Sequence, residues 1–266
     1  MKFRAHDTFF IRKGWLNKGV SQVKKNSSVF ISKTQNPMDV FGIGNNMVKA
    51  LRYWMQVTGL TKEPGKGKRV QEFTDFGKLV RDHDQYIDET GTLLLLHYEL
   101  ASNKDDATAW YFFFNEFTYN EFTKEDFVRE IQNFIQMNNE AEVATRSLED
   151  DFACILSTYQ SRSKTGTTMS PENNIDCPLG ELNLIDVLDK KRKIYRKAIP
   201  SKELFPLLPS LTKSASVKSA CVIRCFVRLT RLSCLPTRRI WQRKPGKRTP
   251  RWHRNPVSYT ALLPAS

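Results

Sequence analysis

The sequence has no acidic residue in its last 62 positions. Residues 205–266 contain 13 Lys and Arg, seven Pro and no Asp or Glu, whereas residues 1–204 contain 29 basic and 28 acidic residues. The net charge of +14 therefore comes almost entirely from this end, and it is no evidence that the remainder binds nucleic acid. Two interpretations of 205–266 stay open: a basic arm that neutralises phosphates, or an out-of-frame or disordered end. Scattered Cys, Trp and Leu favour the second.

Long apolar runs are also missing. The longest apolar stretches, 93–96 and 109–114, are far shorter than the roughly 20 residues that span a bilayer. Charged side chains such as Lys2 and Arg4 stand where a signal peptide would need an apolar run. Five cysteines without a paired CxxC motif indicate neither a disulfide framework nor a zinc ribbon. We therefore expect a cytoplasmic protein.

Several enzyme signatures are absent. Gly42-x-Gly44 lacks the third glycine of a dinucleotide-binding turn, and Gly67-Lys68 is followed by Arg69 rather than Ser or Thr, so there is no P-loop. Neither a GxSxG nor an HExxH motif occurs. These absences argue against an ATP-driven enzyme and against the hydrolases that use those motifs.

Helical periodicity is what the sequence does contain. Residues 123–136 and 147–159 carry apolar side chains at helical spacing, with Thr123 and Ser147 as the expected N-caps. Two segments between Thr90 and Phe117 are apolar on all sides and are expected to fill the centre of the domain.

The expected fold class is mainly α, with a small β pair around residues 182–195. Residues 1–204 form one expected domain, which could divide into a part over 1–62 and a helical part over 69–204. Breaker residues at 63–68 mark that division. Residues 205–266 are expected to be irregular.

Residues 37–57 have the pattern of a helix-turn-helix. Pro37–Phe41 could form a short first helix, Gly42 to Gly44 the turn, and Asn45–Val57 the second helix. The face expected to enter the core carries Met47, Leu51 and Trp54. The opposite face carries the side-chain types that contact bases and phosphates in a major groove, namely Asn45, Lys49, Arg52 and Gln56. An ordinary amphipathic helix with a solvated polar face is the alternative.

The N-terminal segment alternates basic and aromatic residues, a pattern that can hold a phosphate backbone against stacking rings. The DNA-binding candidates in it are Arg4, Arg12, Lys13 and Lys18. Alternatively, its Phe and Trp side chains belong to the core and its basic side chains reach outward.

Four blocks, taken in order, resemble a bacterial protein family. They are FRAHDTFFIRKGWLNKG, GIGNNMVKALRYW, DETGTLLLLHYELA and WYFFFNEF. Together they are similar to the family catalogued as the domain of unknown function 4007 (DUF4007), over residues 3–199. Asn45 stands where a lysine is expected, and Leu94 where a tryptophan is expected. Residues 205–266 have no counterpart in the pattern, so a C-terminal part of the family domain is expected to be missing.

The resemblance implies a role in DNA phosphorothioation, a sulfur modification used in bacterial defence. It implies the B component of an Ssp-type system, with a proposed DNA-nicking role. The implied partners are DNA, a cysteine desulfurase, an ATPase and a PAPS-reductase-like sulfur transferase, and a second copy of the chain (a homodimer) is a further candidate. Two other functions stay open: a non-enzymatic DNA-binding regulator that uses the same helix, and a scaffold that docks the sulfur-transfer proteins without touching DNA.

Strand scission would need a nucleophile or carboxylates that hold a metal ion. The richest cluster is the run of residues 81–84, in which Asp82 and Asp84 could hold Mg²⁺, an ion that takes oxygen ligands and keeps several waters. A solvated turn is the commoner structure for such a run.

Other catalytic candidates are His6 and Asp7. His97 lies in an apolar segment and is expected to be a core histidine. Asp189 and Lys191, downstream of Glu181, form a weaker nuclease-like pattern.

Overall fold

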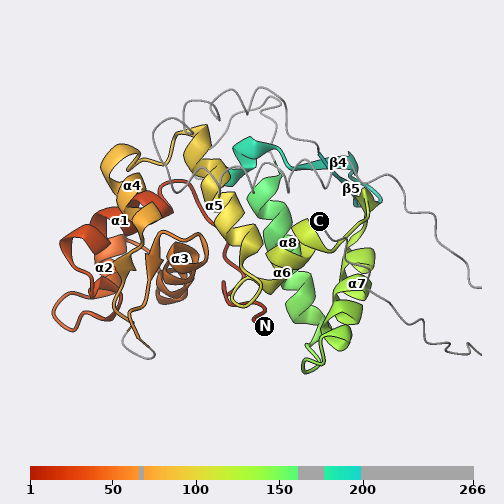
Figure 1. Cartoon of the computed structure of the whole chain (residues 1–266), viewed down its shortest axis with the longest axis horizontal. Coiled ribbons are helices and arrows are strands. Elements are labelled where there is room, and N and C mark those ends of the chain that lie inside the picture. The colour runs from red at the N-terminus through yellow and green to blue at the C-terminus, as the bar shows by residue number, and fades with distance from the viewer. Residues whose placement is uncertain (66–68, 161–176, 199–266) are drawn as a thin grey trace, which may run out of the picture. The chain divides into compact units, whose positions relative to one another are not determined.

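The computed structural model describes residues 1–65, 69–160 and 177–198 (Figure 1). The helices in these ranges are α1 (Trp15–Lys25), α2 (Pro37–Phe41), α3 (Asn45–Val57), α4 (Asp75–His83), α5 (Thr90–Ser102), α6 (Thr108–Asn115), α7 (Lys124–Met137) and α8 (Thr145–Tyr159), with the 3-10 helices η1 (Val29–Ile31) and η3 (Pro178–Leu182). The mainly α fold is therefore confirmed. Residues 205–266 lie outside the described ranges.

Two small antiparallel sheets accompany the helices. Strand β1 (Thr61–Lys62) pairs with β2 (Glu72–Phe73) directly after α3. In the second sheet β5 (Ile194–Lys197) lies between β3 (Glu121–Phe122) and β4 (Ile185–Asp189). The β pair expected around residues 182–195 is thus present, and β3 joins it as a third strand that the sequence did not indicate.

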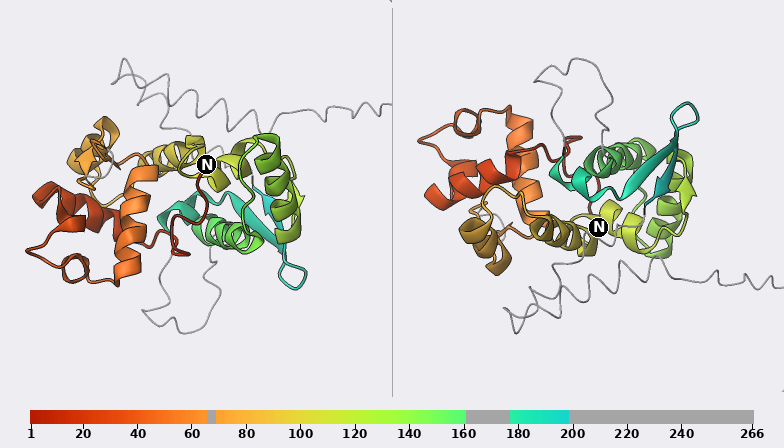
Figure 2. Two further views of the ribbon diagram at one scale, coloured as in Figure 1. Left: turned by 90° about the horizontal axis from the view of Figure 1, so that it is seen from below. Right: turned by 90° about the horizontal axis from the view of Figure 1, so that it is seen from above.

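Helices α1, α2 and α3 pack on one another at the N-terminal side of the described chain (Figures 1 and 2). The boundaries expected for α2 and α3 are confirmed. Asn36 caps α2 by accepting a hydrogen bond from the Met38 N–H, and Gly42 ends the helix at φ 64°, a conformation that glycine adopts without strain. On α3, Leu51 and Trp54 are fully buried as expected, while Met47 is partly buried.

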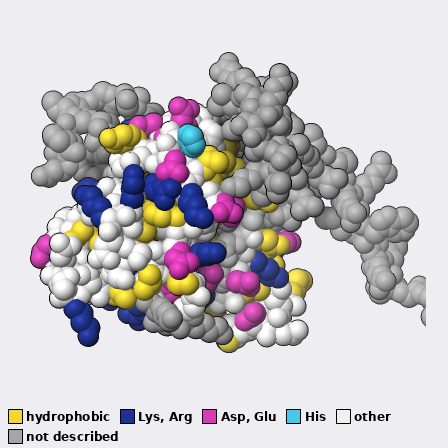
Figure 3. All heavy atoms as spheres, turned by 60° about the vertical axis from the view of Figure 1, so that its left-hand side comes forward, with side chains coloured by type: hydrophobic (Ala, Val, Ile, Leu, Met, Phe, Trp, Pro, Cys, Tyr) yellow, Lys and Arg dark blue, Asp and Glu magenta, His cyan; other side chains and the backbone are white. Residues whose placement is uncertain are grey.

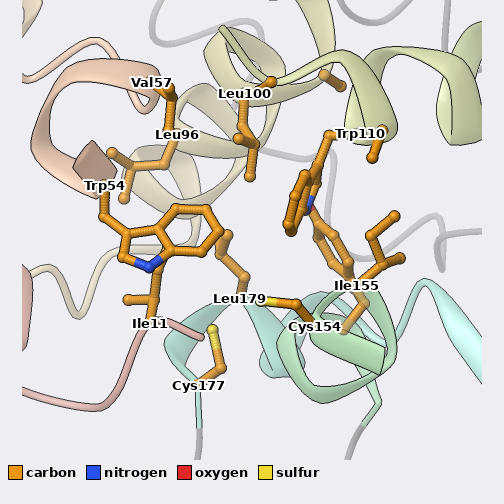
Figure 4. Packing of buried hydrophobic residues seen from close by; sticks show 14 of the residues in the cluster. Ile11, Trp54, Val57, Leu96, Leu100, Trp110, Cys154, Ile155, Cys177 and Leu179 are labelled. Atoms are coloured by element: carbon orange, nitrogen blue, oxygen red, sulfur yellow. The ribbon is translucent and has the colours of Figure 1, made fainter. Parts of the chain in front are cut away.

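The apolar helices α5 and α6 supply much of the core, which explains why they lack a polar face. Figure 4 shows Trp54 of α3 and Trp110 of α6 among Leu96, Leu100 and Leu179. The two indole rings meet edge to face, with centroids 5.3 Å apart. The core is therefore continuous from α3 to α6.

Helices α7 and α8 pack side by side beyond this core (Figures 1 and 2). A capping box between Thr123 and Asp126 begins α7, as expected. The expectation that Ser147 caps α8 is wrong, because α8 begins two residues earlier and its N-cap is Ala144. Short local patterns define the start of a helix poorly when no cap side chain is present.

The N-terminal segment is tied to α8 and α6. The Arg4 N–H donates to Asp151, and the Lys2 N–H donates to the Thr108 hydroxyl. Lys197 of β5 similarly donates to the carbonyl oxygens of Phe113 and Phe117 at the end of α6. No helix in the described ranges is long and apolar enough to cross a membrane.

Candidate nucleic-acid interface

Charge is unevenly divided along the first 204 residues. Residues 1–62 contain 11 Lys and Arg against two Asp, whereas residues 63–204 contain 18 Lys and Arg against 26 Asp and Glu. The first part includes α1, α2 and α3. Figure 3 brings the α1, α2 and α4 side of Figure 1 forward and shows Lys and Arg side chains in a row across that surface. The N-terminal helices therefore form the basic part of the described chain.

A pocket of about 210 Å³ lies where α3 begins. Its basic side chains are Lys49 and Arg52 from α3 and Arg69 from the segment before β2. Asn36 and Asn45 also line it. Three of the four polar α3 residues expected to contact DNA thus lie at one site, and the structure adds Arg69 to them.

Glu63 balances part of this positive charge. Its Oε1 lies 3.9 Å from Arg52 Nε and accepts hydrogen bonds from Gln56 at 2.8 Å and Gln71 at 3.2 Å. Gln56, the fourth residue of the polar face, is therefore held in a side-chain network at the base of the β1–β2 hairpin. It is less free to meet a ligand than Lys49, which is exposed and donates to Asn46 at 3.3 Å.

The pKa of the Arg52 guanidinium is lowered from its ordinary value. Burial is the largest cause, Glu63 opposes it, and the positive charge of Arg69 adds to it. Like charges held together and partly desolvated are stabilised when an anion joins them. This electrostatic arrangement suits a phosphate.

The basic residues of the N-terminal segment do not gather at this pocket. Arg12 packs over the rings of Phe9 and Trp15, at 6.0 and 5.3 Å from their centroids. Lys13 is exposed just before α1, and Lys18 is exposed on it with its Nζ 3.4 Å from the Phe41 carbonyl oxygen. The rings pack inward and the lysines remain on the surface, as the alternative interpretation of the segment expects. Contact of Arg12, Lys13 and Lys18 with DNA stays a prediction.

Arg4 makes contacts of a different kind. Its Nε lies 2.8 Å from Asp150 of α8, so this side chain joins the N-terminal segment to an acidic stretch. Its use as a DNA contact stays a prediction.

His6 is fully buried. Its Nε2 lies 2.7 Å from Asp151 Oδ1, and Trp54 and Trp110 pack around its ring. Its Nδ1 has no hydrogen-bond partner among the described residues. Burial raises the pKa of Asp151, although His6 and the Arg4 N–H favour the charged form. A side chain with no exposed surface cannot touch a phosphodiester in this conformation, so the placement favours a structural role for His6.

Asp7 is exposed, and its neighbour His6 points away from the surface. The backbone at Asp7 has φ 51°, and its N–H donates to the Arg4 carbonyl oxygen. The structure therefore does not bring the His6 and Asp7 side chains together as one catalytic pair.

Asp82 and Asp84 both have donors close by. Arg81 donates to the two oxygens of Asp82 at 2.7 and 2.8 Å, which lowers the pKa of Asp82. Asp84 accepts from the backbone N–H groups of Asp88 and Glu89 at 3.1 and 3.2 Å, just before α5. Within the described ranges no three His, Cys, Asp or Glu side chains cluster as metal ligands. Both carboxylates are therefore bonded to donors of the chain itself, and a magnesium ion held by them stays a prediction.

The remaining candidates lie apart from the α3 pocket lining. His97 is a core histidine, as expected, with its Nδ1 2.8 Å from the Tyr159 hydroxyl. Asp189 accepts from the backbone N–H of Lys191 in the β4–β5 turn. Glu181 is exposed on η3.

Two residues that the structure brings to a candidate site were not predicted from the sequence: Arg69 at the α3 pocket and Asp151 beside His6. Arg69 follows a Gly-rich breaker and carries no periodic signal, so only the β1–β2 pairing shows that it reaches α3. Asp151 could have been found, because it is an acid on the apolar stripe of α8 formed by Leu148, Phe152 and Ile155. A buried acid of this kind needs a partner.

Two solved structures of SspB have a fold similar to that of this chain. A structure described as magnesium ion-bound SspB is 25% identical with a TM-score of 0.64, and the match covers 80% of this chain and 67% of that one. A second SspB structure is 27% identical with a TM-score of 0.66, covering 78% and 62%. This chain thus spans about two thirds of their length. No curated protein matches it.

The profile of a family described as protein of unknown function DUF4007 matches residues 3–219 of this chain. It extends beyond residue 199, where the resemblance carried by the four sequence blocks ends. The expectation that 205–266 has no counterpart is therefore wrong for residues 205–219. Because the profile covers most of the sequence and both similar structures share its fold, this chain belongs to the DUF4007 family.

Proposed function

We propose that this protein engages DNA as the B component of an Ssp-type DNA phosphorothioation system. The resemblance to DUF4007 implies that system, and the similarity to SspB structures supports it. The observation that carries the DNA contact is the convergence of Lys49, Arg52 and Arg69 at the start of α3, in the basic part of the chain. Such a cluster neutralises phosphates and releases their counterions.

The helix α3 is the proposed recognition helix of a helix-turn-helix. It follows the short helix α2 after the turn at Gly42–Gly44, and a small β hairpin follows it. Asn45 and Lys49 are exposed on its N-terminal half, the part of a recognition helix that contacts base edges. No side chain caps α3 at Gly44, so its first N–H groups are available to a phosphate.

The decisive experiment compares neutralised variants in a DNA-binding titration over a range of salt concentrations. Lys49→Gln with Arg52→Gln should weaken binding and reduce the salt slope by about two, because each lost phosphate contact removes about one unit of slope. The matched control is Lys190→Gln with Lys193→Gln, which removes the same charge from the exposed β4–β5 turn. The control should bind like the wild type.

Two results would contradict this proposal. Absence of DNA binding by the wild-type chain would favour the scaffold that docks the desulfurase, ATPase and sulfur transferase. Equal losses in the α3 variant and in its control would show that only overall charge matters.

Strand scission is a finer part of the proposal. Asp82 would have to leave Arg81 before it could hold Mg²⁺, whose usual sites take one or two carboxylates and several waters. Supercoiled plasmid should be nicked by the wild type and spared by Asp82→Asn with Asp84→Asn, while DNA affinity is kept. Nicking at the normal rate by the double variant would leave Asp82 and Asp84 as the C-terminal end of α4 without a catalytic role. No nicking by either protein would favour the non-enzymatic regulator.

A further inference from the structure

The pocket at the start of α3 has two unlike sides. Lys49, Arg52 and Arg69 supply positive charge on one side. Phe30, Pro37 and Met38 supply apolar surface on the other, from η1 and α2. A flat phosphate-binding surface needs only the first side, so the apolar side requires its own explanation.

The basic side keeps an excess of charge. Glu63 lies 3.9 Å from Arg52 and is the carboxylate that faces these cations. Lys49 and Arg69 form no ion pair within the described ranges. One acid against three bases leaves a net positive charge, which attracts the single negative charge of a phosphodiester.

The apolar side is firmly held. Phe30 is 8% exposed and stacks on Phe41, with ring centroids 5.0 Å apart and an interplanar angle of 22°. Met38 is 40% exposed, so part of this side is open to solvent. A fixed aromatic ring beside an adaptable thioether, next to cations, can accept a sugar or a base.

We infer that this pocket binds one nucleotide unit, with its phosphate at Lys49, Arg52 and Arg69 and its sugar or base against Phe30 and Met38. The inference rests on the proposed DNA contact and adds a defined subsite to it. A pocket of about 210 Å³ is smaller than the roughly 300 to 1,000 Å³ of sites that enclose a drug-sized ligand. It therefore has room for part of one nucleotide unit, its phosphate with one edge of the sugar or base, rather than for a stretch of strand.

Filling the pocket without changing its charge tests this inference. Met38→Trp should weaken binding of a fluorescent 20-base-pair duplex about tenfold and leave the salt slope unchanged, because the indole takes the space of the sugar or base while the cations remain. Gln35→Trp is the matched control, since Gln35 is exposed and precedes α2 without lining the pocket. It should change the Kd less than about twofold.

A second variant covers the basic side. Arg69→Gln should weaken duplex binding and lower the salt slope by about one. Lys62→Gln, an exposed lysine on β1, is its control. Thermal melting of each variant should match the wild type. Duplex binding by Met38→Trp and Arg69→Gln at wild-type strength would overturn the inference while leaving the proposed function intact.

The source of the phosphate is decided by competition. If the occupant is part of DNA, then dAMP and inorganic phosphate at equal ionic strength should compete weakly with the duplex. If dAMP binds the wild type but not Met38→Trp, while the duplex does not bind at all, the pocket is a free-nucleotide site and the proposed function fails. If neither dAMP nor duplex binding responds to Met38→Trp, no nucleotide enters the pocket.

Discussion

At the scale of single residues, His97 should make the stability of the protein depend on pH. Burial lowers the pKa of His97 to about 3, whereas a histidine in the unfolded chain keeps a pKa of about 6.5. Between these values the unfolded state binds the proton and the native state does not, so stability falls as pH falls from 6.5 toward 3. Above pH 6.5 the contribution is fully present.

His97→Gln tests this, because glutamine can still bond to Tyr159 but does not titrate. Between pH 7 and pH 5 the free energy of unfolding should fall by about 2 kcal/mol more in the wild type than in the variant. Urea unfolding at the two pH values measures the difference. An equal fall in the free energy of unfolding in both proteins would show that groups other than His97 cause the loss of stability at low pH.

Asp151 should be among the most sensitive residues of the molecule. It is 1% exposed and holds both His6 Nε2 and the Arg4 N–H. Asp151→Ala should lower the free energy of unfolding by about 3 kcal/mol, since it leaves two buried polar groups unpaired. Asp7→Asn, at an exposed position nearby where asparagine also tolerates the positive φ, should change it by less than about 0.5 kcal/mol. Similar unfolding curves for the two variants would contradict the prediction that the buried contact between Asp151 and His6 stabilises the fold.

At the scale of helices, α7 and α8 differ in how they begin. Thr123 caps α7 through a capping box, whereas Ser147 lies inside α8. Thr123→Ala should therefore destabilise the protein by about 1 kcal/mol, and Ser147→Ala should have little effect. Chemical unfolding of both variants tests the assignment. A larger cost at Ser147 would indicate that it caps the helix after all.

At the scale of the whole molecule, the 13 basic residues of 205–266 could produce DNA binding unrelated to α3. If this stretch contributes no packing, a chain ending at residue 219 should melt at the wild-type temperature. A chain ending at residue 205 should do so as well. A drop of several degrees for the shorter chain alone would show that 206–219, which the family profile includes, packs on the domain.

The sequence by itself determined the mainly α fold, because helices arise from local features. The apolar period of Asn45–Val57, the Gly42 to Gly44 turn and the Thr123 cap each act within a few residues, and all three are present. The four family blocks likewise needed no three-dimensional information. The prediction that Ser147 caps α8 was wrong although a cap is also a local feature, because the N-cap is Ala144, whose side chain cannot form a capping hydrogen bond.

Only the tertiary structure decided which polar residues meet. His6 finds Asp151 145 positions away, and Arg69 reaches the start of α3 because β2 pairs with β1. The burial of His6 and the hydrogen bond from Arg81 to Asp82 are also features that no sequence periodicity predicts. The physical reason is that a local pattern fixes the direction of a side chain on its own helix, whereas its partner and its exposure depend on how the helices pack.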